Sequence, residues 1–213
     1  MTNRKAQAMR TKKALFDSAL ALFKEKGFDA VTIEEIAQRA GTAKGTFYTY
    51  FSTKSAIIIE EFQAIDDHYR RYARNLRRYE SATQQLIAFT RTQLRYVRDK
   101  IGLEMLKLLY SNQLVHPQTQ KILIDTKRYL HVLVRDILRS GQDRGEFRTD
   151  IEAGRLAQLF NRSMRSIFLD WAISDSAFDL VREGTDYCEL VLLPALQGRT
   201  SEKSQRQPPV PGE

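Results

Sequence analysis

Four residues near the start of the chain have the types and the spacing to contact DNA: Lys44, Gly45, Thr46 and Tyr48. A lysine ammonium can donate to O6 and N7 of guanine, and a threonine offers a hydroxyl and a methyl group to a base edge. A tyrosine hydroxyl can bind a phosphate. The glycine, which has no side chain, leaves space for a phosphate or a base edge to come close. Together these residue types predict contact with the major groove of a duplex.

The surrounding segment, residues 32–51, reads TIEEIAQRAGTAKGTFYTYF and predicts two short helices joined by a turn. Thr32 and Glu35 have the spacing of a capping box, which starts the first helix. The apolar face of this helix repeats at helical steps and consists of Ile33, Ile36, Ala37 and Ala40. Gly41 then allows the positive φ at which a helix ends. The second helix, residues 44–50, is rich in poor helix formers, which favours selection for its surface. Such helix-turn-helix pairs place their second helix in the major groove.

The helix that follows begins with a lysine in an unfavourable position. Ser52 is expected to cap this helix, which places Lys54 in its first turn, where the helix dipole repels a cation. A nearby phosphate would explain the lysine. Phe47 and Phe51, in contrast, are expected to point inward and to anchor the second helix of the pair in a core.

This region resembles the DNA-binding domain of the TetR family of transcriptional regulators. The resemblance covers roughly residues 10–60 and rests on Ala19, Leu22, Phe23, Gly27, Phe28, Thr32, Ile36, Ala37, Ala40, Gly41, Lys44, Gly45, Thr46, Tyr48, Tyr50, Phe51 and Lys54. Members commonly have Val-Ser where this chain has Thr42 and Ala43, so the usual serine cap and phosphate contact must come from Thr42 or be absent. Members also often have Glu at the position of Ser55. The candidate DNA contacts are Thr32, Thr42, Lys44, Gly45, Thr46, Tyr48, Tyr50 and Lys54.

The charge of the chain is concentrated where these candidate contacts lie. The 213 residues carry a formal net charge of +8 and have a pI near 9.6, which favours a polyanionic partner. Many soluble proteins are mildly basic, so the total alone decides little. Residues 1–55 contain ten basic and five acidic side chains, and this quarter of the chain therefore holds more than half of the excess.

Other kinds of function find little support in the sequence. The single cysteine, Cys188, excludes an internal disulfide and is expected to be a buried apolar residue rather than a redox sensor. The histidines His68, His116 and His131 lack metal-binding spacing. There is neither a phosphate-binding glycine loop nor a nucleophile elbow. We expect no enzymatic activity, no metal site and no cofactor. No stretch resembles a membrane span or a signal peptide, so the expected location is the cytoplasm.

The hydrophobic pattern predicts an all-α fold. Helices are expected near residues 11–26, 52–79, 83–100, 103–114, 117–140, 149–173 and 176–194. The sixth is expected to start at a second capping box, formed by Thr149 and Glu152. Residues 1–55 would form a three-helix DNA-binding domain with the helix-turn-helix. Residues 56–198 would form a larger helical domain for ligand binding and dimerisation. The tail, residues 199–213, lacks apolar periodicity and is expected to be disordered.

The last two helices are more apolar than packing on one face requires, which predicts a partner surface. The apolar residues of the first are Ala153, Leu156, Phe160, Met164, Ile167 and Trp171, and those of the second include Tyr187, Leu190, Val191, Leu193 and Leu196. A two-fold homodimer through these helices would form a four-helix bundle, as the resemblance also implies. Two reading helices one DNA turn apart, about 34–36 Å, would then fit a palindromic operator.

The resemblance further implies a small-molecule effector between the connecting helix, residues 52–79, and the later helices. Effector binding would tilt the connecting helix and release the DNA, and repression is the usual direction of regulation in the family. The candidate lining residues are Phe62, Tyr69, Met105, Leu109, Tyr110, Met164, Phe168 and Trp171. The alternative for each of them is ordinary helix core. Asn112, Gln113, Asn161 and Arg165 are polar candidates to orient a ligand, or they belong to the surface.

Two alternatives concern the DNA contact itself. A helical protein that coats DNA without reading its sequence would share the basic composition, and only sequence preference would distinguish the two. The far end of the connecting helix also carries Arg70, Arg71, Arg74, Arg77 and Arg78. This run is either a second DNA patch or, as we favour, a solvated or acid-paired helix face.

Overall fold

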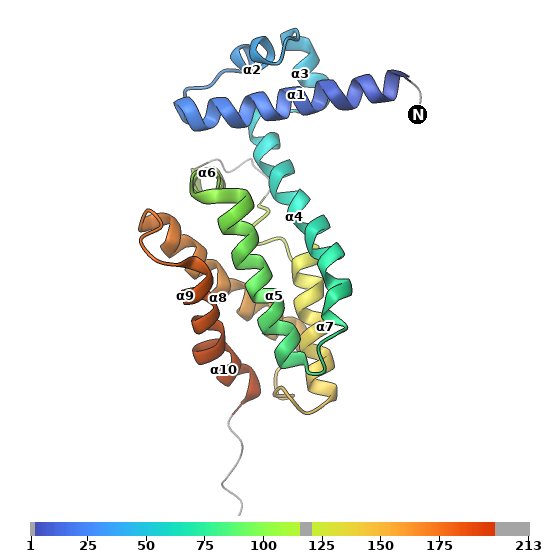
Figure 1. The fold of residues 1–213 in the computed structure, drawn as a ribbon, viewed down its shortest axis with the longest axis vertical. Coiled ribbons are helices and arrows are strands. Elements are labelled where there is room, and N and C mark those ends of the chain that lie inside the picture. Colours follow the sequence, from blue (N-terminus) through green and yellow to red (C-terminus); the bar gives the residue numbers. More distant parts are fainter. Residues whose placement is uncertain (1–2, 116–120, 199–213) are drawn as a thin grey trace, which may run out of the picture.

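The computed structural model describes residues 3–115 and 121–198, and these residues form helices joined by turns, without strands. This confirms the predicted all-α fold. Three helices make the N-terminal head: α1 (Asn3–Lys26), α2 (Ile33–Arg39) and α3 (Lys44–Tyr50). In Figure 1, α1 lies across the upper end of α4, and α2 and α3 lie on the opposite side of α1. The long helix α4 (Lys54–Leu76) leads from the head along the body.

The body is a larger bundle of helices beside α4. Its elements are α5 (Ala82–Tyr96), the π-helical segment η1 (Val97–Ile101), α6 (Gly102–Val115), α7 (Tyr129–Asp143), α8 (Ala153–Ile173), α9 (Leu180–Tyr187), a second π-helical segment η2 (Cys188–Leu192) and α10 (Leu193–Gln197). In Figure 1, α5 runs between α4 and α9. The predicted disordered tail lies outside the described residues.

One core runs through both parts of the molecule. In the head it contains Leu15, Ile36 and Phe47, and in the body it contains Phe89 and Leu138. Helix α4 connects the two regions, because its buried face continues from the head to the far end of the helix. Burial of this apolar surface is the main force that stabilises the bundle.

The prediction of a helix over residues 117–140 is wrong for residues 121–128. Residues 121–128 form turns, and α7 begins only at Tyr129; residues 116–120 lie outside the described residues. The cause is a contact from α4. Asp66 accepts hydrogen bonds from the Arg128 guanidinium and from the backbone N–H of Tyr129. This carboxylate therefore occupies the N-terminus of α7 and holds Arg128 in an extended conformation outside the helix.

Other helix ends differ by smaller amounts. The cap of α4 is Thr53 rather than Ser52, and its hydroxyl accepts from the N–H of Ala56. Helix α1 begins earlier than predicted, and α4 ends at Leu76 rather than near Tyr79. The predicted capping box of Thr149 and Glu152 is wrong: Glu152 is itself the N-cap of α8, and its carboxylate accepts from the N–H of Arg155. Cys188 is fully buried with its sulfur 3.6 Å from the Thr90 hydroxyl, which confirms its prediction as a buried apolar residue.

The described ranges, 3–115 and 121–198, contain neither a membrane-spanning helix nor a cluster of metal-binding side chains. None of their helices is long and apolar enough to cross a bilayer. None of their His, Cys, Asp or Glu side chains gather in threes around a point where a metal ion could bind.

Candidate nucleic-acid interface

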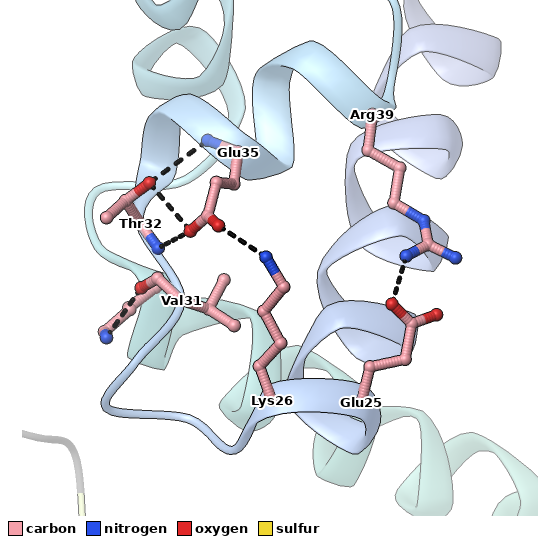
Figure 2. A network of polar contacts seen from close by, with 7 residues as sticks. Glu25, Lys26, Val31, Thr32, Glu35 and Arg39 are labelled. Carbon is pink, nitrogen blue, oxygen red and sulfur yellow. Dashed lines mark hydrogen bonds and ion pairs between the residues drawn. The ribbon is translucent and has the colours of Figure 1, made fainter.

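The start of α2 is fixed by its own first residues. The Thr32 hydroxyl accepts from the N–H of Glu35 at 3.2 Å, and the Glu35 carboxylate accepts from the N–H of Thr32 at 2.8 Å. Figure 2 shows this reciprocal pair, which confirms the predicted capping box. The helix ends at Arg39 with Ala40 as its C-cap, and Gly41 follows with a φ of +67°. The N–H of Thr42 then donates to the carbonyl of Ala37 at 2.9 Å. The turn that orients α3 is therefore encoded locally.

Two ion pairs hold α2 against the end of α1. Lys26 Nζ lies 2.7 Å from Glu35 Oε1, and Arg39 Nη1 lies 2.6 Å from Glu25 Oε2 (Figure 2). The hydrogen bond from Lys26, followed by those from Thr32, lowers the pKa of Glu35 to about 2. Because these pairs are exposed, they contribute little stability. Their main effect is to fix the orientation of α2, and with it the position of α3.

Helix α3 has one buried and one exposed face. The Phe47 ring is 0% exposed and packs against Phe51 with a centroid distance of 5.6 Å, which confirms both as core anchors. The opposite face exposes Lys44, Gly45 and Tyr48, the last to 52%. Thr49 is exposed beside them but is missing from the predicted contacts. Its spacing of four residues from Gly45 was a signal that could have placed it on the same face.

The remaining predicted residues of α3 are less accessible. Thr46 is half-buried, and Tyr50 is half-buried against the core. Lys44 forms an ion pair with Glu34 of α2, and the hydrogen bond between them raises the pKa of Lys44 and lowers the pKa of Glu34. To contact a base, the Lys44 ammonium must therefore leave or share this carboxylate.

Thr42 does not replace the serine that caps this helix in the family. The N-cap of α3 is Ala43, which has no side-chain cap. The Thr42 hydroxyl is buried and has no hydrogen-bond partner among the described residues. The serine cap is therefore absent from this chain, because the Thr42 hydroxyl does not bond to the N-terminus of α3.

Lys54 has a structural role that the sequence did not indicate. Its ammonium donates to three backbone carbonyls in the connection between α1 and α2, those of Phe28 at 2.6 Å, Val31 at 2.9 Å and Asp29 at 3.2 Å. It also lies 4.5 Å from the centroid of the Phe28 ring. These contacts explain a lysine in the first turn of α4 without a phosphate. All three of its donors are used within the head.

Most of the predicted effector residues pack inside the body. Phe62, Tyr69, Leu109, Met164 and Trp171 are buried, and Tyr110 and Phe168 are half-buried. Met105 instead lines a cleft of about 580 Å³ between α1 and α6, which none of the other seven reaches. The eight residues are thus distributed between the core and this cleft.

Polar side chains that were candidates to orient a ligand take part in bonds between helices. Asn112 of α6 donates to the Ser55 hydroxyl of α4 at 3.0 Å, while its own Oδ1 is buried with no partner in the described residues. Asn161 of α8 lies 3.2 Å from Nδ1 of His131 on α7. The Tyr110 hydroxyl donates to the carbonyl of Arg165 at 3.0 Å. These contacts couple α4, α6, α7 and α8.

Two protein-family models match the head and the body in turn. Residues 15–60 match the model described as bacterial regulatory proteins, tetR family, and residues 62–193 match the model described as YsiA-like protein, C-terminal region. The chain belongs to the TetR family. It is therefore a DNA-binding transcriptional regulator. Proteins of this family bind operators, act as dimers and bind small-molecule effectors.

Relatives of this TetR family regulator include the fatty acid metabolism regulator protein of Bacillus subtilis, which is 25% identical over 179 residues, or 84% of this chain and 92% of the relative. The HTH-type transcriptional repressor KstR2 of Rhodococcus jostii is 24% identical over 188 residues, or 84% of this chain and 87% of the relative. Such relatives support a ligand-responsive DNA-binding repressor.

Solved structures share the fold of this TetR family regulator. Thermus thermophilus FadR in complex with lauroyl-CoA has a TM-score of 0.69 at 22% identity, covering 95% of this chain and 100% of that chain. Bacillus subtilis FadR in complex with stearoyl-CoA also has a TM-score of 0.69, at 23% identity, covering 86% and 98%.

The exposed face of α3 leads to a prediction for two variants of the TetR family regulator. Lys44→Ala is expected to weaken operator binding roughly ten- to hundredfold and to relax the preference at one base position in each half-site. Glu34→Gln is expected to strengthen binding severalfold, because Lys44 no longer has a carboxylate partner and a negative charge is removed. Fluorescence anisotropy with operator and with random duplexes measures both effects.

Lys100→Ala provides the matched control, since it removes an exposed lysine from η1 in the body. It should leave both affinities unchanged. If Lys44→Ala weakened binding to operator and to random DNA equally, the lysine would contact only phosphates and would not read a base.

Proposed function

We propose that this protein is a repressor that binds a palindromic operator as a homodimer and leaves it when a fatty acyl-CoA binds to its body. The observation that carries the DNA contact is the two-sided α3, in which Lys44 and Tyr48 are exposed while Phe47 behind them is completely buried. Thr49 joins these residues in the proposed contact surface, and Lys54 is left out of it because its donors are used within the head. Binding alone is sufficient for this role, and we propose no catalysis.

The effector class comes from the relatives together with the body of this chain. Two FadR proteins with the same fold are bound to lauroyl-CoA and stearoyl-CoA, and a full-length relative regulates fatty acid metabolism. The body of this chain has a long apolar interior in which an acyl chain could replace packing between side chains. We propose that Phe62 and Tyr69 of α4 contact this chain together with Leu109, Met164 and Trp171. The domain division predicted at residues 55 and 56 fits this separation of roles, although it falls within α4.

Release requires the effector to prefer one geometry of the body over another. Helix α4 begins in the head at Lys54 and is bonded to α6 through Asn112 and to α7 through Asp66. An acyl chain that separates these helices would move α4, and the head with it. The spacing of the two reading helices in a dimer would then no longer match one turn of DNA, about 34–36 Å.

Dimerisation is proposed through α8 and the segment from α9 to α10. Three large apolar side chains are exposed at the end of α8 and in η2, namely Ile173 at 72%, Leu190 at 75% and Val191 at 51%. Leu190→Arg is expected to turn the dimer into a monomer and to abolish cooperative operator binding, because a cation would enter an apolar interface. Multi-angle light scattering measures the mass, and Leu114→Arg, also at an exposed leucine, is the control. A monomeric wild type would contradict the proposed dimer.

Two experiments test the function as a whole. Selection of bound fragments from random DNA should recover an inverted repeat with half-sites one helical turn apart. Addition of lauroyl-CoA should then release the labelled operator, while lauric acid and free coenzyme A should release it much less. Recovery of no motif would favour a protein that coats DNA. A symmetric motif without release by any acyl-CoA would support sequence-specific DNA binding and would contradict the proposed acyl-CoA effector. Because a transcriptional regulator must reach the chromosome, we propose the cytoplasm as its location.

A further inference from the structure

A basic groove lies on the outer face of the body, at the opposite end of α4 from the head. It has a volume of about 500 Å³, and it is lined by residues of α5, of the end of α4 with the turn that follows it, and of η2. Its charged and aromatic lining residues are Tyr72, Arg78, Tyr79, Arg91, Arg95 and Glu189. This size lies within the range of small-molecule sites.

The groove has an excess of positive charge. Among the described residues that line it, Glu189 is the only acid, and it pairs with Arg91 at 2.9 Å. The Arg78 guanidinium donates to the Tyr79 hydroxyl at 3.2 Å, and Arg95 is exposed. The hydrogen bond from Arg78, with the charges of Arg78 and Arg91, lowers the pKa of Tyr79. Two cations therefore face the groove without an acidic partner lining it.

An operator bound by α3 cannot neutralise these arginines. Helix α4 separates the groove from the head. Its N-terminal end lies beside α1 (Figure 1), and Tyr72, near its C-terminal end, lines the groove. A helix of this length spans roughly 33 Å at 1.5 Å per residue. Arg78 therefore lies too far from α3 to form a second DNA patch on the same duplex. An anion that pairs with these arginines would have to come from another molecule.

We propose that this groove binds the phosphates of the nucleotide part of coenzyme A. Arginine binds phosphate oxygens through paired N–H donors, and tyrosine rings offer a face on which adenine can stack. The proposal rests on the proposed acyl-CoA effector. The floor of the groove also lies next to the core: the Tyr72 hydroxyl is 3.4 Å from the carbonyl of Ala88, and the neighbouring core rings of Tyr69 and Phe89 meet at 5.1 Å. An acyl chain attached to a bound coenzyme would enter the core between α4 and α5.

The test compares two thioesters that differ only in the nucleotide, lauroyl-CoA and lauroyl-pantetheine, by isothermal titration calorimetry. The wild type should bind lauroyl-CoA at least about tenfold more tightly, which is the size expected for one charge-assisted phosphate contact. The double variant Arg78→Ala/Arg95→Ala should lose this difference and keep its affinity for lauroyl-pantetheine. Glu189→Gln should instead increase the difference severalfold. Arg135→Ala, which removes an exposed arginine from α7, should change neither affinity.

The outcomes separate this inference from the proposed function. If the wild type bound both thioesters equally, or if the double variant kept the tenfold difference, phosphate binding in the groove would be refuted. The proposed acyl effector would be unaffected. If neither thioester bound, the proposed acyl effector would be refuted. Titration with free coenzyme A would then test the groove on its own. Binding of free coenzyme A that the double variant abolishes would support a nucleotide site, whereas no binding would overturn it.

Discussion

Asp66→Ala is expected to lower the free energy of unfolding by about 3–5 kcal/mol, because it leaves the buried Arg128 guanidinium without its counter-ion. The two side chains are each only 10% exposed. Arg128 Nη2 lies 3.0 Å from Asp66 Oδ1, and Nε lies 3.1 Å from Oδ2. The same carboxylate accepts from the N–H of Tyr129, so its loss also removes the cap of α7. The variant therefore affects the packing of α4 on α7 as well as the start of α7.

Asp67→Ala is the matched control for this variant. Asp67 is the next residue of α4, but its carboxylate is 65% exposed and pairs with Arg70 on the surface. Its removal should change the free energy of unfolding by less than about 0.5 kcal/mol. Urea denaturation followed by circular dichroism, at one fixed protein concentration, measures both variants. Equal losses for the two would show that Arg128 finds another partner or water, and would refute the buried ion pair as a main contact between α4 and α7.

The parts of the fold that the sequence predicted well are specified by neighbours in the chain. The Thr32 and Glu35 cap needs only three residues of separation, and the burial of Phe47 opposite Lys44 follows from helical periodicity within a single helix. For the same reason the helix-turn-helix and the exposed face of α3 could be located before the structure was known. The family resemblance added the wider frame of head, connecting helix and body.

The parts that could not be predicted depend on residues far apart in the sequence. Asp66 ends the helical pattern before Tyr129 from a distance of 63 positions, and Glu146 accepts from the N–H groups of Ala82 and Thr83 at the start of α5. Periodicity over residues 117–140 contains no sign of such a contact. The ion pair of Lys44 likewise depends on how α2 is packed beside α3. Sequence reasoning therefore found the candidate site but not the interactions that hold its charges in the free protein.

Lys54→Met is expected to lower the free energy of unfolding of the head by about 2–4 kcal/mol, since each hydrogen bond to a charged donor contributes roughly 1.5–3 kcal/mol and the three are not additive. Methionine keeps an unbranched apolar side chain but loses the donors to the carbonyls of Phe28, Asp29 and Val31. The connection between α1 and α2 would become more mobile. DNA binding should therefore fall together with the stability of the head. Hydrogen exchange of the head amides measures that stability, and operator anisotropy measures binding.

Lys13→Met controls for loss of charge, because this exposed lysine of α1 pairs with Asp17 one turn away. Lys54→Arg separates the two explanations of the native lysine. If Lys54 served mainly to bind phosphate, arginine would preserve operator affinity, and Lys54→Met would weaken binding without loosening the head. If the ammonium serves to join three converging carbonyls, the planar guanidinium fits poorly, and arginine should restore only part of the stability. Lys54→Met would then weaken binding to all DNA because α2 and α3 are displaced. A uniform decrease in binding usually indicates a lost phosphate contact. Here it would have a structural cause.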